Sequence, residues 1–304
     1  MVGPIKRVIV AGYGTMGLGI VKSFAGAGFE TIVWSRRAAE LTGLPAGVCA
    51  VAELPAEAPD LILETIAEER GAKAALYAKI EAAYAGPVII ATNTSGLPLE
   101  DLSTTLERPE NFVGIHYFQP ADVFPMVEVV AGPATAPAVL ARATDAIRGT
   151  GKEPIVLNKP IIGFLINRLQ HALLHEAYHL VSTGVVGPAE VDKVARLMLG
   201  PRMCITGLIE QKDIGGLAIH ALAQASIIPA LAHDGVPNLY PQALARRGEI
   251  GLSAGKGFYD WGQCDEAMVR RQASERLSRL LNFLEREIGP RAPGTTPVPR
   301  PVAL

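Results

Sequence analysis

Residues 7–17 read RVIVAGYGTMG, a short β-branched run followed directly by the glycine pattern G-x-G-x-x-G. Residues 18–27 are helix-periodic, so the glycines stand where a buried strand turns into a helix. There the first glycine allows a tight turn, the second lets a pyrophosphate approach the backbone, and the third lets helix and strand pack closely. A Gly-rich turn in an unrelated α/β protein is the alternative. The pattern favours a dinucleotide site at the positive end of the helix dipole, formed by Gly12, Gly14, Thr15, Met16 and Gly17.

Short apolar runs of the same kind recur through the first half of the chain, each followed by a turn signal or a helical pattern. Strands that are apolar on both faces and alternate with helices are typical of a parallel sheet covered on both sides. We therefore predict an α/β fold that begins with a Rossmann domain, a doubly wound and mostly parallel sheet. The predicted strands are 7–11, 31–34, 61–63, 88–92, 112–115 and 127–130, with 154–157 as a candidate seventh.

The pattern changes after Lys159-Pro160, where long helix-periodic stretches replace the strands. The second domain is therefore expected to be all-helical. Residues 289–304 contain five prolines and almost no periodicity, which indicates a mobile tail. The predicted domains are 1–158, 159–288 and the tail 289–304, and the predicted helical stretches are 163–181, 188–199, 216–232 and 264–288.

Composition narrows the class of partner. The 304 residues include 28 Lys and Arg against 30 Asp and Glu, a net charge of −2, so no basic surplus exists to hold a nucleic acid or an anionic membrane. A small-molecule substrate is expected instead. Three widely spaced cysteines indicate a reducing compartment, and neither a leader peptide nor a membrane-length apolar run is found, so a cytoplasmic location is expected.

The end of the second strand indicates which dinucleotide is bound. An NAD site normally has Asp or Glu there to bind the ribose 2′-OH, whereas this chain has Ser35-Arg36-Arg37. A hydroxyl and two guanidiniums suit a 2′-phosphate, because Arg binds phosphate bidentately and no carboxylate repels it. The alternative is an exposed charged pair that begins a helix. We expect NADP to be preferred, with NAD also accepted.

His116 is the best candidate for the chemistry. It ends a predicted strand on the carboxyl side of the sheet, where open α/β sheets bind ligands. Its ordinary pKa lies near neutrality, so it can take a proton from an alcohol while hydride leaves. Glu128, on the next predicted strand, could orient the imidazole. Taken alone, each has a structural alternative: a buried hydrogen-bonded histidine, or a surface glutamate.

Five motifs in order give the chain a family resemblance. They are NTS at 93–95, HYFQP at 116–120, VEVV at 127–130, GFLINR at 163–168 and SAGKGFY at 253–259. With the glycine loop, they make the chain similar to the 3-hydroxyacyl-CoA dehydrogenases from about residue 6 to 259. The resemblance implies that His116 is the acid/base, that Glu128 orients it, and that Ser95 and Asn167 bind the substrate oxygen. It also implies cofactor contacts at Glu68, Lys73 and Asn93, although a solvated helix face explains Glu68 and Lys73 equally well.

Several positions depart from the family pattern. Only about two dozen residues separate the second strand from Leu61, too few for the helical hairpin that helps these dehydrogenases to bind coenzyme A. Gln119 stands in place of an expected Asn, Pro125 in place of a frequent Lys, and Gly96 in place of a common second Ser. These departures bear on the substrate, and they argue against a coenzyme A thioester.

Three histidines, His171, His175 and His179, share one face of the helix that carries Asn167. Zinc is one interpretation, but such sites usually add a carboxylate or a cysteine, so no metal is predicted. A dimer interface or a polar lining near the substrate is favoured. Because the helical half is so apolar, we also predict a homodimer.

Three functions follow from these observations. The first is an NAD(P)-dependent oxidoreductase that interconverts a 3-hydroxy and a 3-oxo acyl compound, with His116 as acid/base. The second is an NADP-dependent dehydrogenase of a free hydroxy acid or ring alcohol that is not bound to coenzyme A. The third is a nucleotide-binding regulatory protein that has lost catalysis.

Overall fold

The computed structural model describes residues 3–288 and 294–299, so most of the predicted tail 289–304 lies outside the described residues. The chain divides into two compact units after Leu169. Segment 159–169, including Asn167, therefore belongs with the sheet rather than with most of the helices. The domain limits 1–158 and 159–288 stay a prediction.

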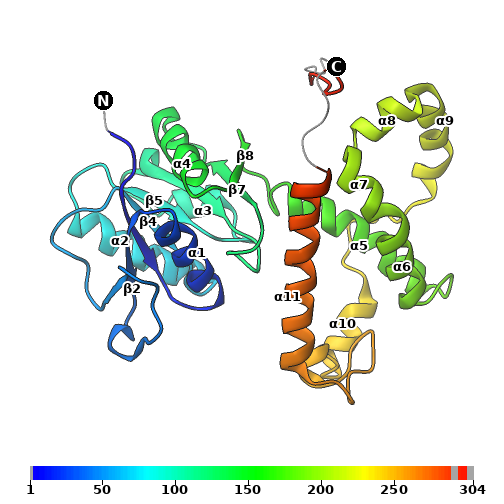
Figure 1. Ribbon diagram of the computed structural model, residues 1–304, viewed down its shortest axis with the longest axis horizontal. Coiled ribbons are helices and arrows are strands. Elements are labelled where there is room, and N and C mark those ends of the chain that lie inside the picture. The colour runs from blue at the N-terminus through cyan, green and yellow to red at the C-terminus, as the bar shows by residue number, and fades with distance from the viewer. Residues whose placement is uncertain (1–2, 289–293, 300–304) are drawn as a thin grey trace. The chain divides into compact units, whose positions relative to one another are not determined.

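The first unit is an eight-stranded sheet with the order β3-β2-β1-β4-β5-β6-β7-β8 (Figure 1). All neighbouring strands are parallel except β6 and β7, which are antiparallel. Strand order reverses between β1 and β4, the position at which open α/β sheets bind nucleotides. The strands are β1 (Arg7–Ala11), β2 (Glu30–Trp34), β3 (Cys49–Val51), β4 (Leu61–Glu64), β5 (Ile89–Thr92), β6 (Phe112–His116), β7 (Met126–Ala131) and β8 (Glu153–Leu157).

Helices cover both faces of this sheet. Val8 and Val10 of β1 pack with α1 (Thr15–Gly26) and α4 (Pro137–Gly149). Ile9, between them in sequence, lies on the opposite face with α2 (Arg70–Ala83) and α3 (Leu99–Ser103). Side chains alternate along a strand, so a strand that is apolar at every position must be buried on both sides. The predicted Rossmann sheet and all seven predicted strands are confirmed.

β3 was not predicted, and it occupies the segment in which the sequence indicates that the family hairpin is missing. Between Trp34 and Leu61 the only regular elements are β3 and one 3₁₀ turn, Ala38–Glu40; the structure describes every residue of this interval. The shortened connection therefore adds one edge strand beside β2 and leaves no room for paired helices.

The second unit is helical, as predicted. The helix predicted from residue 163 begins at Ile166, because Gly163 (φ +77°) and Phe164 (φ +46°) turn the chain first. The sequence did not predict α7, α8 or α10. The helices are α5 (Ile166–Ser182), which crosses the division, α6 (Pro188–Val194) with a π-helical turn over Ala195–Leu199, α7 (Gly200–Thr206), α8 (Glu210–Gly215), α9 (Leu217–Ile227), α10 (Leu239–Arg246) and α11 (Glu266–Phe283).

Very little of the helical unit is buried within one chain. Among its described residues, Leu244 is the only one that is buried. Ile209, Ile219 and Leu222 are 81%, 72% and 75% exposed, which is unusual for large aliphatic side chains. In the part of the chain that the structure describes, no helix is long and apolar enough to cross a membrane.

Candidate active site

The glycine loop lies between β1 and α1 and has the geometry of a phosphate cradle. Gly12 has φ +99°, which only glycine adopts readily, and a Cβ on Gly17 would lie 2.2 Å from the Gly12 carbonyl oxygen. A Cβ on Gly14 would meet nothing within 4 Å, so the space beside this backbone is open. No side chain caps the start of α1. The loop therefore fits a pyrophosphate, whose oxygens can accept from the free N–H groups of the first helical turn.

Ser35, Arg36 and Arg37 follow β2 at the same edge of the sheet. The Ser35 amide donates to the Val51 carbonyl of β3 at 3.0 Å, and its hydroxyl accepts from the Arg37 amide at 3.2 Å. Both arginines are exposed and, among residues 3–288 and 294–299, neither forms an ion pair. Their guanidiniums are therefore available to an anionic ligand.

His116 and Glu128 face one another across the antiparallel pair β6 and β7, where they occupy directly opposed positions. Nδ1 of His116 lies 2.8 Å from Oε2 of Glu128, and the two side chains are 5% and 0% exposed. A carboxylate only accepts, so Nδ1 carries the hydrogen of the neutral imidazole and Nε2 keeps its lone pair. Phe118 and Phe164 contact the ring, with centroids 4.5 and 5.5 Å away. The imidazole is held in one orientation with one basic nitrogen left over.

The other oxygen of Glu128 fixes the start of α5. Oε1 accepts from the amides of Leu165 and Ile166, at 2.8 and 2.9 Å. The left-handed conformation of Phe164 turns these two amides toward the carboxylate. Asn167 is the next residue of the helix. Glu128 therefore holds both the imidazole of His116 and the two amides that precede Asn167.

Asn93 and Ser95 follow β5. The Asn93 side-chain oxygen accepts from the Tyr117 amide at 2.8 Å, which ties the end of β5 to the residue after His116. A cofactor contact of Asn93 stays a prediction. Ser95 is exposed, and its amide donates to Oε1 of Glu68 at 3.0 Å. The structure thus brings Asn93, His116 and Glu128 together through hydrogen bonds, with Ser95 two residues beyond Asn93.

The loop after His116 rests on the nucleotide-binding helix. A Cβ on Gly19 of α1 would lie 2.8 Å from the Ala121 side chain and 3.0 Å from the Asp122 amide nitrogen, so only glycine permits this approach. Lys22 pairs with Asp122 at 3.3 Å. Lys152, whose pKa burial lowers, donates to the Phe124 carbonyl at 2.6 Å. This anchoring was not predicted, and its one signal in the sequence is Gly19 itself, a glycine two residues after the phosphate motif.

Two family models match the chain one after the other. The NAD-binding domain of 3-hydroxyacyl-CoA dehydrogenase matches residues 48–160, and the C-terminal domain of the same enzyme matches residues 163–261. The chain belongs to the 3-hydroxyacyl-CoA dehydrogenase family. Membership makes the protein a dehydrogenase that has an NAD-binding domain and acts on a CH–OH group, and it confirms the family and the enzyme class expected from the sequence.

Known relatives cover most of the length of this dehydrogenase. The 5-formyl-3-hydroxy-2-methylpyridine 4-carboxylate 5-dehydrogenase of Mesorhizobium japonicum is 27% identical, over 92% of this chain and 99% of that protein. A probable 3-hydroxybutyryl-CoA dehydrogenase of Bacillus subtilis is 29% identical, over 84% and 98%.

Solved structures agree on the fold. A crystal structure of 5-formyl-3-hydroxy-2-methylpyridine 4-carboxylic acid 5-dehydrogenase, described as an NAD⁺-dependent dismutase, superposes with a TM-score of 0.85 over 93% of this chain and 99% of that one, at 27% identity. The 3-hydroxyacyl-CoA dehydrogenase of Archaeoglobus fulgidus gives 0.68 over 92% and 99%, at 29% identity.

Lys73 of the dehydrogenase does not lie on a solvated helix face, so that interpretation is wrong for this residue. Its side chain is 1% exposed, and Nζ lies 2.8 Å from both carboxylate oxygens of Glu64. Thr92 and Tyr77 also donate to Glu64. Burial and the charge of Glu64 raise the pKa of Tyr77, which keeps this phenol protonated. Glu64 was missed because its charged partner, Lys73, lies nine positions further along the chain.

The histidine row of α5 carries no metal cluster. Nε2 of His175 lies 3.4 Å from Oδ1 of Asp234, while His171 is exposed. Within the described ranges, no group of three or more His, Cys, Asp or Glu could hold a metal ion. The predicted absence of a metal stays a prediction.

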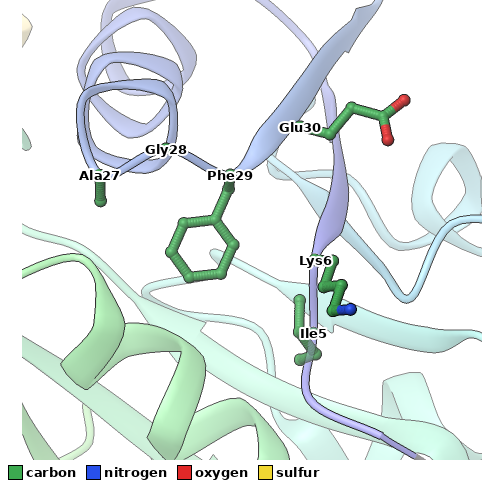
Figure 2. Close-up of a pocket in the computed structure, with 6 residues that line it drawn as sticks. All are labelled: Ile5, Lys6, Ala27, Gly28, Phe29 and Glu30. Carbon is green, nitrogen blue, oxygen red and sulfur yellow. The ribbon is translucent and has the colours of Figure 1, made fainter.

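The surface hollow in Figure 2 is not part of this site. It lies at the start of β1 and β2 and is formed by Ile5, Lys6, Ala27, Gly28, Phe29 and Glu30 (Figure 2). In a parallel sheet that end is opposite the carboxyl edge where the glycine loop and His116 lie.

Proposed function

We propose that the protein is a dehydrogenase of a free hydroxy acid or ring alcohol that is not bound to coenzyme A. The observation that carries the proposal is the short connection between β2 and β4, where one 3₁₀ turn and β3 stand in place of the hairpin that binds coenzyme A. The relative that superposes with a TM-score of 0.85 is named for a pyridine carboxylate, a free ring acid. Both observations favour a compact substrate without a nucleotide handle.

The proposed chemistry is proton transfer at Nε2 of His116. Nδ1 is occupied by Glu128 at 2.8 Å, so Nε2 takes the proton of the substrate hydroxyl during oxidation and returns it during reduction. Glu128 stabilises the imidazolium that forms. A nicotinamide dinucleotide, held by its pyrophosphate at the glycine loop, would supply the hydride acceptor. Ser95 and Asn167 hold the substrate oxygen and stabilise the charge that develops on it.

A substrate panel tests this proposal. We expect turnover of free 3-hydroxy acids or of pyridine and benzene derivatives that carry a carboxylate beside an alcohol. We expect the matching coenzyme A thioesters to show kcat/KM lower by at least about tenfold, because the chain offers them no extra binding energy. Initial rates of NADPH and NADH formation across matched acid and thioester pairs provide the measurement. A clear preference for the thioesters would establish the first of the three functions instead.

A thioester substrate remains the second candidate, since the family motifs at Ser95, His116 and Asn167 are all present. The third candidate, a regulatory protein without catalysis, predicts nucleotide binding and no turnover anywhere on the panel. The ordered His116–Glu128 pair speaks against loss of catalysis.

For the cofactor we propose a preference for NADP over NAD. Its basis is the exposed pair Arg36 and Arg37 behind Ser35, with no carboxylate at the position of the ribose 2′-OH acceptor. Under this proposal, the cofactor preference of this chain differs from that of the pyridine carboxylic acid dehydrogenase, which is described as NAD⁺-dependent.

For the assembly we propose a homodimer formed through the helical unit. Apolar helices must be covered, yet Ile219 and Leu222 of α9 stay exposed in one chain, and closed two-fold dimers are the commonest soluble oligomers. Light scattering at micromolar concentration should give twice the mass of the chain. Leu222→Glu should lower the melting temperature and weaken the dimer, whereas a parent protein that is monomeric would contradict the proposal. A cytoplasmic location stays a prediction.

A further inference from the structure

The carboxylate of Glu68 binds the turn that carries Ser95. Its Oε1 accepts from the Thr94 hydroxyl at 2.5 Å and from the amides of Ser95 and Gly96, both at 3.0 Å. The Thr94 hydroxyl in turn accepts from the Leu97 amide at 3.0 Å. One glutamate oxygen thus determines the backbone course of residues 94–97.

The other oxygen of Glu68 is anchored to the interior of the sheet. Oε2 lies 3.4 Å from Nζ of Lys73, which is buried and holds Glu64 at the end of β4. Burial opposes ionisation of Glu68, but the bonds from Thr94 and Gly96 and the charge of Lys73 outweigh it and lower the pKa of the carboxyl. The anion therefore persists at neutral pH and can keep all three donors. Glu64, Lys73 and Glu68 form a continuous chain from a buried strand end to the Ser95 turn.

The next residue, Glu69, provides a useful contrast. Its carboxylate also accepts two amides, those of Gly71 and Ala72, at 2.8 and 2.6 Å, and so caps the start of α2. Two adjacent glutamates therefore use the same chemistry on different targets. One stabilises a helix end, and the other holds an active-site turn.

We propose that Glu68 is a positioning residue that acts on the substrate through Ser95. The inference rests on the proposed function, in which the Ser95 hydroxyl binds the substrate oxygen. This role is separate from the cofactor contact that the family resemblance implies for Glu68: Oε1 accepts the three hydrogen bonds of the turn, whereas Oε2 faces Lys73 on a side chain that is 42% exposed. Donors that stabilise charge in the transition state must be held within a fraction of an ångström, and Glu68 provides that restraint for Ser95.

The test compares Glu68→Ala, Glu68→Gln, Ser95→Ala, the double variant of Glu68→Ala with Ser95→Ala, and the control Glu69→Gln. Glu68→Ala should lower kcat, measured at saturating cofactor, by about 10²-fold, the loss typical of a misplaced catalytic group, and this loss should exceed any rise in the Kd for NADPH and NADH. Glu68→Gln keeps one acceptor oxygen and should fall between the parent and Glu68→Ala. Glu69→Gln should lower the melting temperature and leave kcat near that of the parent, because it removes only helix capping.

The double variant separates positioning from a general loss of stability. If Glu68 acts through Ser95, adding Glu68→Ala to Ser95→Ala should cost little more than Ser95→Ala alone. Additive losses, or a rise in cofactor Kd that matches the fall in kcat, would overturn the inference and leave Glu68 with a cofactor role alone. If Glu68→Ala does not fold, Glu68→Gln carries the same comparison.

The two proposals fail in different ways. A Ser95→Ala protein with the parent kcat removes Ser95 from the proposed function, and the role of Glu68 goes with it. A slow Ser95→Ala protein beside a fully active Glu68→Ala protein overturns the inference alone.

Discussion

His116→Asn should lower kcat by about 10²–10⁴-fold, the usual contribution of general acid–base catalysis, and leave NADPH affinity within about threefold of the parent. Nε2 is the one basic atom of the imidazole not engaged by Glu128. Asparagine can still bond to Glu128 through its amide group, but it offers no group that titrates near neutrality. The loss should therefore fall on turnover rather than on binding of the nucleotide, which meets the glycine loop.

Rates, cofactor affinity and melting curves distinguish this result from a loss of folded protein. The control is His233→Asn, at an exposed position in the helical unit, for which the parent values are expected. A folded His116→Asn protein with a near-parent kcat would show that another group carries the proton. A large fall in melting temperature with proportionate loss of cofactor binding would mean that His116 is only a structural residue of the sheet.

Glu128→Gln extends the same experiment, because Glu128 works through His116. An amide keeps one oxygen for three donors, the Nδ1 of His116 and the amides of Leu165 and Ile166, so one of these contacts must weaken. The double variant of Glu128→Gln with His116→Asn should be little slower than the slower single variant. Additive losses in kcat would show that Glu128 also acts independently of His116. Its hydrogen bonds to the amides at the start of α5 would explain such an effect.

The strands and the catalytic pair could be predicted because both leave local signals. A strand buried on two faces is apolar at every position, as in RVIVA at 7–11, and the glycine loop follows it directly. His116 ends one such strand, and Glu128 lies within the next. The antiparallel register of β6 and β7 then places the two residues opposite each other. β3 could not be predicted, since three residues at a sheet edge, CAV at 49–51, carry too short a pattern.

The rest of the site depends on contacts between distant residues. Lys73 has the sequence context of a solvated helix, and only the buried Glu64, nine positions earlier, explains why its charge lies inside. The helix expected from residue 163 starts at Ile166, because Glu128, 38 positions earlier, fixes the amide of Ile166. In both cases the decisive partner is a carboxylate on a strand, and nothing near the residue in sequence reveals it. The buried carboxylates of Glu64 and Glu128, and not the helix propensity of the local sequence, determine where the charge of Lys73 lies and where α5 begins.

Ser35→Asp should reverse the order of cofactor affinities, so that NADH binds more tightly than NADPH. The aspartate would stand at the end of β2, where it accepts from the ribose 2′-OH and repels a 2′-phosphate. Two like charges about 4 Å apart in partly solvated surroundings repel each other strongly enough to change the affinity for NADPH by about 10²-fold, even after screening by salt. In the parent, Arg36 and Arg37 should give the opposite preference.

Fluorescence titration with NADPH and NADH measures the effect, and salt provides an independent readout. If guanidiniums bind the 2′-phosphate, parent affinity for NADPH should fall more steeply with ionic strength than affinity for NADH, because the extra attraction is between charges that solvent screens. Ser35→Ala, the matched control without a charge, should keep the NADPH preference, and Arg36→Ala with Arg37→Ala should remove it. Equal affinities in the parent, with parallel salt curves, would show that the two arginines point away from the nucleotide and that NAD serves as well as NADP.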